Sequence, residues 1–500
     1  MRKKSSNVPG DIPWKLIREF SVEIAEPLCN ILNSATLEGV WPQLWKHEYI
    51  TPVPKVYPPK SVDDLRKISG TKNFSKIYEA LLSRYIVDDI ATSMDPSQYG
   101  NRKGLSTNHY LVVMLNKILT LLDTNNKKEK YAVIVQFIDW SKAFDRQDPK
   151  IGINNFIKYG VRPTLIPTLK SFLQNRTMTV KWHGLTSELR NLPGGGPQGC
   201  SFGGLEFDVN SNDNANHVEA DMRYKFVDDL STLELLNLLT IGLSSYNFKA
   251  HVASDIGVHQ KYLTPENFNG QDSLNALEQW TKDNKMVLNT KKSNVMIFNF
   301  TNDHQFASRL YLGGQLLDTI SETKLLGVKI TSDLKWHKNS DMLVKKGYQR
   351  MRMIQKLKSF GVEEKDLVTI YMLYIRSILE QNCQVWHYSL TYDDEVNIER
   401  VQKVACFLIL QENYENYGSA LKQLNLDTLK SRRDTLCLKF ARKCLKHPKA
   451  KEIFPENTVV DHNFRSREKY YVQPARTDRL LHSTVPQLQR ALNLNQREYS

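Results

Sequence analysis

The sequence predicts an α+β fold in which an antiparallel β-sheet is enclosed by helices. Two apolar runs are typical of strands: residues 133–138, rich in Val and Ile, and residues 224–230, in which an Asp-Asp dipeptide interrupts the run. Asp-Asp is a turn dipeptide, so the second run indicates a strand, a tight turn and another strand. Apolar residues also recur at helical spacing through residues 338–445. Strands combined with separate helical regions favour an α+β architecture.

The part of the chain before the first predicted strand is expected to be mainly helical. Apolar residues recur at helical spacing within residues 11–50, and further helices are predicted at 72–92 and 107–123. A loop rich in Pro, Lys and Asp at 52–65 interrupts them, and a polar loop at 125–130 ends them. The predicted sheet therefore begins only after about a quarter of the chain.

Helices and strands alternate in the middle of the chain. Residues 149–175 are predicted to be helical, and a strand pair around 177–190 leads into a loop rich in Gly and Pro at 192–204. After Gly203, the Asn and Asp residues within 210–216 have low helix propensity and weaken any prediction of a helix there.

Helices dominate the last part of the predicted fold. After the Asp-Asp turn, a helix is expected at 271–285, a strand at 293–300 and a short hairpin at 309–318, ahead of the helical region that ends at 445. From residue 455 the chain is polar and lacks clear periodicity, which indicates a flexible tail.

The composition favours an intracellular protein with an anionic partner. The 500 residues carry a formal net charge of +14, for which nucleic acid is the simplest partner, although a merely soluble basic protein has the same signature. The six cysteines form no CxxC pair and no zinc-ligand spacing, so they are expected to be reduced thiols. We expect no signal peptide, no membrane span and a nuclear or cytoplasmic location.

Acidic residues end both predicted strands. Asp139 follows the run 133–138, and Asp228 and Asp229 occupy the predicted turn. If the strands are neighbours in one sheet, Asp139 and Asp228 can face each other, and such a pair can hold two metal ions about 3.5–4 Å apart for phosphoryl transfer. The alternative is an ordinary hairpin turn together with a helix N-cap at Asp139.

The glycine-rich loop is a second candidate for ligand contact. Glycine allows the backbone to approach a ligand closely, and Gln198 supplies both a hydrogen-bond donor and an acceptor. A flexible surface loop would have the same composition. The loop lies between the two acidic segments in the sequence, and this order favours ligand contact over an ordinary surface loop.

The order of these three features closely resembles the reverse transcriptases of non-LTR (LINE-type) retrotransposons. FIDWSKAFD at 137–145 resembles the first palm motif of that family, GGPQG at 195–199 the second and FVDD at 226–229 the third, with Val227 where many relatives have Ala. Several motifs in the right order are far more specific than one alone.

Further stretches resemble the family in the same order, from about Trp41 into the C-terminal third of the chain. They are ITPVPK at 50–55, LRKIS at 65–69, KIYEALLSRYI at 76–86, QYGNRKGLST at 98–107, the fourth palm motif at 280–298 and LLGVKITSDLKW at 325–336. Two positions depart from the family: Lys67 replaces a proline and Asn101 replaces an aromatic residue.

The resemblance implies a right-hand polymerase with an antiparallel palm sheet, helical fingers and a helical thumb. The corresponding boundaries are fingers at 1–130, a palm at 131–335 with an inserted fingers segment at about 149–190, a thumb at 336–450 and a polar tail at 451–500.

The activity implied by the resemblance is RNA-directed DNA polymerisation. A primer 3′-hydroxyl would attack the α-phosphorus of a dNTP with the help of two Mg²⁺ ions, for which Mn²⁺ could substitute. Asp139 and Asp228 would be the metal ligands, with Asp229 as a third, looser acid. The partners would be an RNA template, a DNA primer, their RNA·DNA hybrid and dNTPs; the sequence identifies no protein partner.

Three residues of the first two motifs match nucleotide-pocket positions of the family. Phe144 stands at the steric gate that would exclude a ribose 2′-hydroxyl, although a core aromatic is the alternative role. Gln198 and Gly199 would line the pocket. Asp145 is expected to be structural because it lies six residues after Asp139.

Basic residues match the remaining functional positions. Lys55 and Arg66 would clamp the triphosphate, and Lys292, or its neighbour Lys291, would protonate the leaving pyrophosphate. Each could equally be a solvated surface cation.

A basic run follows the palm and could track the phosphates of the duplex. It comprises Lys345, Lys346, Arg350, Arg352, Lys356 and Lys358. These residues occupy more than one helix face, so some are expected to be merely solvated.

Three rival functions remain at this stage. They are an RNA-dependent RNA polymerase, a group II intron-type maturase and reverse transcriptase, and a non-catalytic RNA-binding relic of a retroelement. Phe144 argues against the first, and Val227 argues against the second, whose members usually carry Ala there. The intact acids argue against the third. No endonuclease or ribonuclease H pattern is visible, so a fragment, a split reading frame and a decayed copy are all compatible with the sequence.

Overall fold

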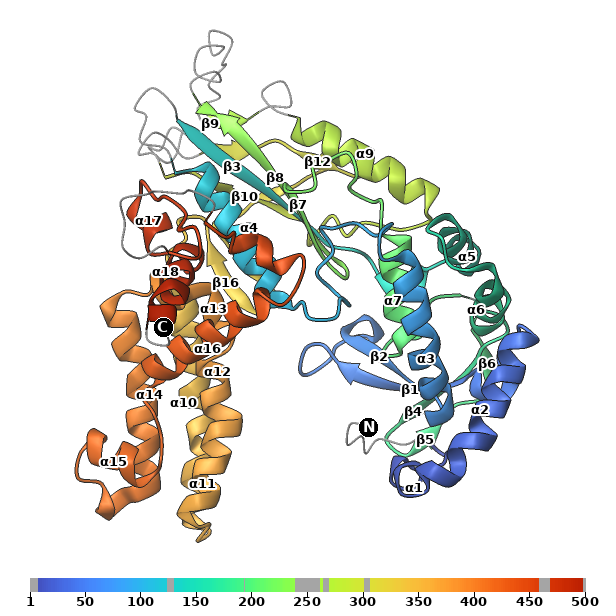
Figure 1. The fold of residues 1–500 in the computed structure, drawn as a ribbon, viewed down its shortest axis with the longest axis horizontal. Coiled ribbons are helices and arrows are strands. Elements are labelled where there is room, and N and C mark those ends of the chain that lie inside the picture. Colours follow the sequence, from blue (N-terminus) through green and yellow to red (C-terminus); the bar gives the residue numbers. More distant parts are fainter. Residues whose placement is uncertain are drawn as a thin grey trace.

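The computed structural model describes most of the chain as two arms joined by a sheet (Figure 1). The N-terminal helices form one arm, and the helices after residue 336 form the other. The described residues are 8–123, 130–192, 194–238, 261–263, 269–300, 306–457 and 468–497. Most of the polar loop predicted at 125–130 lies outside them.

The central sheet is mixed, and β8 and β10 both run antiparallel to β3, which lies between them. β3 pairs with β8 on one side and with β10 on the other, and β7 pairs with β8. Short β14 runs parallel to β10 at the edge. The strands are β3 (Tyr131–Ile138), β7 (Arg223–Phe226), β8 (Asp229–Asn237), β10 (Asn294–Phe298) and β14 (Asp318–Thr319). The two apolar runs of the sequence are therefore neighbouring strands, which is the condition under which Asp139 and Asp228 can face each other.

Alternation along β3 explains why that strand is buried on both faces. Val133, Val135 and Phe137 point into the core that α4 shares with the C-terminal arm. Ile134 and Ile138 point to the opposite side, into a second core. Successive side chains of a strand face opposite sides, so a continuous apolar run is expected for a strand covered on both faces.

The N-terminal arm packs helices around a small second sheet. β1 pairs with β2 and with β4, so the chain before residue 71 is joined to the chain near residue 180. The core of this arm is centred on Trp41, which is fully buried and stacks on Tyr78 at 4.3 Å between ring centroids. The strands are β1 (His47–Pro54), β2 (Leu65–Gly70), β4 (Thr177–Trp182), β5 (Leu185–Thr186) and β6 (Arg190–Asn191).

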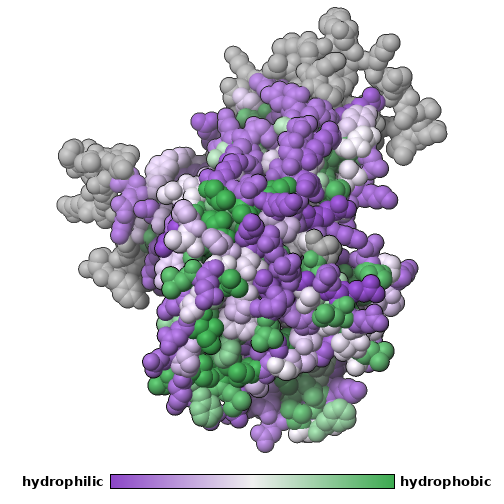
Figure 2. All heavy atoms as spheres, turned by 90° about the vertical axis from the view of Figure 1, so that its right-hand side faces the viewer, coloured by the Kyte–Doolittle hydropathy of each residue, from purple (hydrophilic) through white to green (hydrophobic). Residues whose placement is uncertain are grey.

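The helices of this arm follow the predicted segments closely. They are α1 (Trp14–Glu19), α2 (Ser21–Leu37), α3 (Asn73–Ile90), α5 (Pro149–Lys158), α6 (Ile166–Leu173) and α7 (Ser201–Asn210). The helix after Gly203 therefore forms, although the Asn-rich stretch ends it at Asn210. Figure 2 views this side of the molecule and shows apolar side chains gathered among polar ones. On α2, Val22 and Leu37 are more than four-fifths exposed.

The C-terminal arm is helical, and its core is continuous with one face of the central sheet. Leu367, Tyr371 and Trp386 belong to the same buried cluster as Val133 and Val135. The helices are α4 (Thr107–Leu121), which packs between sheet and arm, and α10 (His337–Ser359), α11 (Glu364–Tyr371), α12 (Ser377–Leu379), α13 (Cys383–Trp386), α14 (Tyr392–Leu410), α15 (Tyr417–Gln423) and α16 (Leu429–Cys444).

Shorter elements connect the sheet to this arm. They are β9 (Lys261–Leu263), α9 (Gly270–Asp283), β11 (Phe306–Ser308), β12 (Tyr311–Leu312), β13 (Gln315–Leu316), β15 (Glu322–Leu325) and β16 (Val328–Thr331). β12 and β13 form the hairpin predicted at 309–318. α9 covers the face of the sheet opposite α4, because Leu274 and Leu277 belong to the second core.

The C-terminal stretch is not a flexible tail as predicted. α17 (Asp478–Leu481) and α18 (Thr484–Arg497) fold back onto the arm, and Val485, Leu488 and Leu492 are buried in the main core. Their spacing of three and four residues makes one apolar stripe, which the polar composition of the segment obscured. Part of the predicted tail, residues 458–467, lies outside the described residues. Within the described ranges, no helix is long and apolar enough to cross a membrane.

Candidate active site

Three carboxylates lie at one edge of the central sheet. Asp139 directly follows β3, Asp228 lies in the turn between β7 and β8, and Asp229 begins β8. The register pairs Ile138 with Leu230, so continuing it by one residue sets Asp139 beside Asp229. The two acidic segments of the sequence therefore meet, and the meeting depends on the antiparallel pairing of β3 with β8.

The carboxylates are close enough to perturb one another. Burial raises the pKa of Asp229 to about 7, with further contributions from the charges of Asp228 and Asp139. Burial also raises the pKa of Asp228 above its usual value, and the charge of Asp139 adds to this. Asp228 is itself exposed to solvent, so the burial effect on its pKa comes from the protein atoms that crowd the turn around it. The edge thus concentrates negative charge that a cation would stabilise.

Asp139 is oriented by two residues of the stretch that resembles the fourth palm motif, neither of which was singled out from the sequence. Asn289 donates a hydrogen bond from Nδ2 to Asp139 Oδ2 at 2.8 Å, and the Asp139 amide donates to Ser293 Oγ at 3.1 Å. Burial raises the pKa of Asp139, while the nearby charge of Lys292 opposes the rise. Lys292 thus lies where the sequence predicted a lysine near the acids. Asn289 and Ser293 had no signal of their own in the sequence.

The Asp228-Asp229 turn is supported by the segment 97–100. The Tyr99 amide donates to the Lys225 carbonyl at 2.8 Å, and Gln98 Oε1 accepts from the Val227 amide at 3.1 Å. Val227 has a φ of 57°, an uncommon conformation for a β-branched residue. A Cβ atom at Gly100 would lie 2.5 Å from the Val227 nitrogen, so the two backbones are in direct contact. The turn is therefore held in a strained shape by a neighbouring strand-like segment.

The side chain that precedes the turn on β7 is also anchored. The Lys225 ammonium is buried, 2.7 Å from Asp95 Oδ2, and it donates to the carbonyl of Asn212 at 2.9 Å. The neighbouring Lys225 and Arg223 charges hold the pKa of Asp95 well below its usual range, against the effect of burial. The Lys225 side chain thus anchors β7, the strand that leads to Asp228 and Asp229.

The glycine-rich loop lies against the turn that follows Asp139. The Gly196 amide donates to the Phe144 carbonyl at 3.1 Å, and the Ser69 amide of β2 donates to the Gln198 carbonyl at 3.0 Å. At Gly195, which has a φ of 85°, a Cβ would lie 3.1 Å from the Phe144 carbonyl oxygen. Close approach therefore requires glycine there. The first two motifs and strand β2 meet at this loop.

Most of the predicted pocket residues lie around the place where the glycine-rich loop, the turn after Asp139 and β2 meet. The Phe144 ring is partly exposed and packs on Phe207 at 5.1 Å between centroids. Gly199 has a φ of 100° and faces β2. The charge of Arg66 on β2 opposes the rise in the pKa of Asp228 that burial causes, which places Arg66 within electrostatic reach of the acids. Lys55 instead donates to the Asp63 carbonyl at 3.0 Å, and no described contact links it to the acids.

Two buried acids beneath the glycine-rich loop were not identified from the sequence. Glu206 and Asp208 lie on α7, and burial raises the pKa of each to about 8. A Cβ at Gly196 would lie 3.0 Å from Glu206 Oε2, so this acid directly underlies the loop. Both carboxyls are therefore expected to be neutral at pH 7 and to add no charge to the site.

The chemistry of the three acids suits divalent cations. Hard cations such as Mg²⁺ bind one or two carboxylates together with substrate phosphates. None of the ion pairs in the described part of the chain involves Asp139, Asp228 or Asp229, so their charge is unpaired by protein cations. Among the described residues, however, no three His, Cys, Asp or Glu side chains converge into a ready-made metal cage. A bound cation would draw the acids together and share its remaining positions with substrate oxygens.

The basic run on α10 divides between two faces. Lys345 and Arg352 line a hollow of about 530 Å³ together with Tyr348 and Gln349. Lys346 lies on the other face, where burial and the charges of Lys324 and Arg350 lower its pKa. Arg350 also donates to the Tyr374 carbonyl at 2.9 Å. The three predicted residues Lys345, Lys346 and Arg350 therefore do not form one surface, and Arg352 is the better companion of Lys345.

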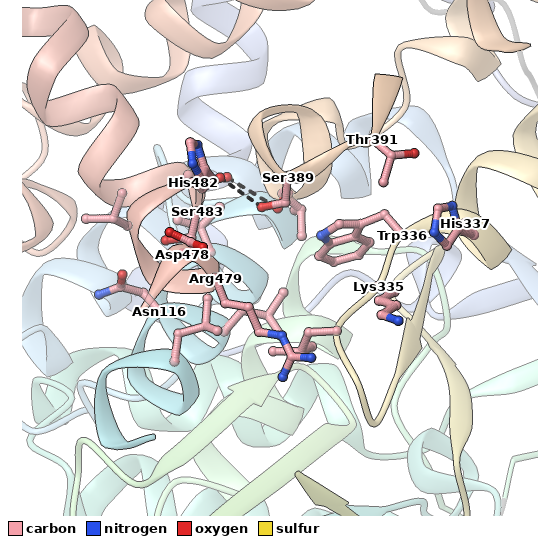
Figure 3. Close-up of a pocket in the computed structure, with 17 residues that line it drawn as sticks. Asn116, Lys335, Trp336, His337, Ser389, Thr391, Asp478, Arg479, His482 and Ser483 are labelled. Atoms are coloured by element: carbon pink, nitrogen blue, oxygen red, sulfur yellow. Dashed lines mark hydrogen bonds between the residues drawn. The ribbon is translucent and has the colours of Figure 1, made fainter. Parts of the chain in front are cut away.

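A separate cavity of about 390 Å³ lies between α4, the segment 334–337 and the C-terminal helices. Figure 3 shows Asp478, Arg479 and His482 on one side of it and Trp336 on another, with Ser389 bonded to the His482 carbonyl at 3.0 Å. None of the predicted site residues lines this cavity, so it is distinct from the edge that carries the acids.

Comparison with known proteins places the acids in a recognised domain. Residues 57–234 match the family "Reverse transcriptase (RNA-dependent DNA polymerase)". This range contains Asp139, Gln198, Asp228 and Asp229, which belong to the three motifs singled out from the sequence.

Two curated relatives come from Drosophila melanogaster. The chain is 26% identical over 422 residues to a probable RNA-directed DNA polymerase from transposon BS, covering 80% of this chain and 42% of the relative. It is 26% identical over 334 residues to the RNA-directed DNA polymerase from mobile element jockey, covering 65% of this chain and 33% of the relative. The aligned part thus spans less than half the length of these relatives.

Among solved structures, apo telomerase from Candida tropicalis aligns with a TM-score of 0.41 and 13% sequence identity, over 86% of this chain and 68% of that one. This likeness is too distant to support an argument about the site. The family match over residues 57–234 and the curated relatives, which are RNA-directed DNA polymerases of transposable elements, agree with the resemblance inferred from the motifs.

Proposed function

We propose that this chain is an RNA-directed DNA polymerase that extends a DNA primer on an RNA template with dNTPs. The observation that carries the proposal is the meeting of Asp139, Asp228 and Asp229 at one sheet edge, beside the glycine-rich loop and β2. Each of these segments is a motif of the reverse transcriptase family, and three distant parts of the chain supply them.

The acids would bind the metal ions of the reaction. Two divalent cations, Mg²⁺ or Mn²⁺, would supply activation of the primer hydroxyl and stabilisation of the leaving pyrophosphate. Asp139 and Asp228 would hold them, with Asp229 as the third acid. Asn289 holds the Asp139 carboxylate in one orientation through its hydrogen bond, as the hydrogen-bond partners of metal ligands commonly do.

Residues around the edge would bind the nucleotide. Arg66 would meet the triphosphate, since its charge already reaches Asp228. Gln198 and Gly199 would line the pocket from the loop, and Phe144 would crowd a ribose 2′-hydroxyl. Lys292 lies close enough to Asp139 for its charge to oppose the rise in the Asp139 pKa, and this closeness to the acids supports a role in proton donation to the pyrophosphate. Lys55 is the weakest assignment, because its ammonium is bound to its own loop.

The architecture supports a division into fingers, palm and thumb. β1 pairs with both β2 and β4, and this joins the two segments assigned to the fingers, 1–130 and about 149–190. The central sheet would be the palm and α10–α16 the thumb. The thumb boundary extends beyond residue 450, because α18 packs against α4, α13 and α16. The basic face of α10 around Lys345 would contact the RNA·DNA hybrid.

The test is primer extension on an RNA template by single-charge variants. Asp139→Asn and Asp228→Asn each remove one ligand charge with little change in packing and should abolish dNTP incorporation. Asp221→Asn is the matched control, because Asp221 is an exposed acid just before β7 whose partner is Lys117. Its activity should stay within about twofold of the parent. A loss of less than tenfold in either test variant, about 1.4 kcal/mol in the barrier, contradicts the assignment. A parent chain that binds RNA without extending a primer would favour the non-catalytic alternative.

A further inference from the structure

Asp145 joins three segments of the nucleotide side of the candidate site. Its Oδ1 atom lies 2.6 Å from the Lys67 ammonium on β2. The same oxygen accepts a hydrogen bond from Gln198 Nε2 at 3.3 Å, from the glycine-rich loop. Lys67 is a departure from the family pattern, and Asp145 was expected from the sequence to be merely structural. The structure makes the two residues partners.

Gln198 is consequently held at two points. Its backbone carbonyl accepts from the Ser69 amide at 3.0 Å, and its side-chain amide donates to Asp145. Ser69 lies two residues after Lys67 on the same strand, so the bonds to Gln198 and to Asp145 form a closed ring between β2, the loop and the turn after Asp139. One amide hydrogen of Gln198 is used in this ring. The other hydrogen and Oε1 are left to bind a ligand.

The ring is accessible to a ligand. The side chains of Lys67 and Asp145 are 27% and 35% exposed, so both groups reach solvent at the pocket rim. Phe144, the residue assigned to sugar selection, directly precedes Asp145, and its carbonyl accepts from the Gly196 amide at 3.1 Å. A shift of Asp145 would therefore move the loop and the gate residue together.

We propose that Asp145 is a positioning residue for the incoming deoxynucleoside triphosphate: it holds Gln198 and Lys67 in place so that the loop and β2 enclose the nucleotide at a fixed width. The proposal rests on the proposed polymerase function. Lys67 neutralises the carboxylate, which would otherwise repel the triphosphate. Asp145 itself touches neither the reacting atoms nor the metal-binding acids.

A second ion pair in the same place provides a matched control. Lys142 Nζ lies 3.0 Å from Asp63 Oδ1 and likewise links the turn after Asp139 to the chain beside β2. Its side chains are 59% and 76% exposed, and it does not bond to Gln198. Exposed pairs of this kind contribute little to stability. Comparing Asp145→Ala with Asp63→Ala separates the bond to Gln198 from the removal of an ion pair in general.

The first measurement is steady-state primer extension at varied dNTP concentration. Asp145→Ala should raise KM for dNTP about five- to tenfold and change kcat less than threefold, because the residue orients the pocket and not the reacting groups. Asp145→Asn should restore most of the parental KM, since its amide oxygen still accepts from Gln198 and Lys67. Asp63→Ala should stay within twofold of the parent in both parameters.

The second measurement is hydrogen exchange without nucleotide, at the peptide that contains Ser69. The Ser69 amide bonds to the Gln198 carbonyl, so Asp145→Ala should speed its exchange while Asp63→Ala leaves it unchanged. If the parent chain does not extend primers, the proposed function fails, and this comparison still decides whether Asp145 holds the loop. Unchanged exchange in Asp145→Ala, or a fall in kcat with an unchanged KM, overturns the proposal.

Discussion

Substituting Gly100 by alanine should disable the site through the Asp228-Asp229 turn, although Gly100 contacts no substrate. The added Cβ would lie 2.5 Å from both the nitrogen and Cγ2 of Val227. Carbon atoms pack at about 3.5–4.0 Å, so the backbones must separate by about 1 Å. Rotation of a side chain cannot relieve the overlap, because one of the two atoms belongs to the backbone. The turn that carries the acids is therefore the part that must move.

The magnitude follows from two separate effects. Overpacking of this kind typically costs about 1–3 kcal/mol of stability. A displacement of about 1 Å at catalytic groups can cost about 100-fold in rate. Gly100→Ala should therefore remain folded, with a Tm lowered by several degrees, while primer extension falls about 100-fold. The loss of activity should exceed what the loss of folded protein explains.

The assay pairs thermal unfolding with single-turnover primer extension. Gly418→Ala is the control, because a Cβ there would meet only Asn416 Oδ1 at 3.4 Å, an ordinary contact. Adding Val227→Gly to Gly100→Ala removes the clash with Cγ2 and relaxes the positive φ, so part of the activity should return. If Gly100→Ala keeps activity within threefold of the parent, segment 97–100 does not set the position of the acids.

Three further outcomes are expected. Phe144→Val should admit ribonucleotides, and an unchanged ratio of rNTP to dNTP incorporation with dNTP activity retained would make Phe144 a packing residue only. Replacing Lys345, Lys346 and Arg350 by alanine should make binding to the RNA·DNA hybrid less dependent on salt. The slope of log affinity against log salt should fall by about one unit for each phosphate that the protein no longer neutralises. A parental slope would exclude a role for these residues in phosphate binding. Burial and nearby positive charges lower the pKa of His109 to about 4. The unfolded chain therefore binds the extra proton between about pH 6.5 and pH 4, and stability should fall as the pH drops through this window. His109→Gln should reduce the fall in the free energy of unfolding, measured by urea unfolding at several pH values. An equal fall in the variant and the parent would refute this role of His109.

Much of the fold could be predicted because the burial of a helix or strand requires a pattern of apolar residues within that one element. The continuous apolar run of β3 and the helical spacing of α3, α4 and α10 were visible in the sequence, and these elements form within a few residues of their predicted bounds. The C-terminal helix α18 was missed for the opposite reason. Its apolar stripe is narrow, and the surrounding polar residues dominate any average over the segment.

The acids of the candidate site were also predictable, but their supports were not. Asp139 and the Asp-Asp pair are unusual at the ends of apolar strands, and the order of these segments with the glycine-rich loop between them made them candidates for the site. Asn289 and Ser293 are ordinary polar residues in a loop, and only their hydrogen bonds to Asp139 distinguish them. The split of the basic run on α10 follows from helix geometry, whereas the neighbours that bury Lys346 come from packing.

By itself the sequence determined which strands are apolar, where their acids lie and which family the motif order belongs to. These properties depend on neighbouring residues along the chain, so local pattern records them. Only the tertiary structure decided that Lys67, Asp145 and Gln198 meet, and that segment 97–100 supports the Asp228-Asp229 turn. Such contacts join residues from about 50 to 130 positions apart. They depend on strand register and on the paths of loops between elements, and these are set by packing of the whole domain, which no local pattern encodes.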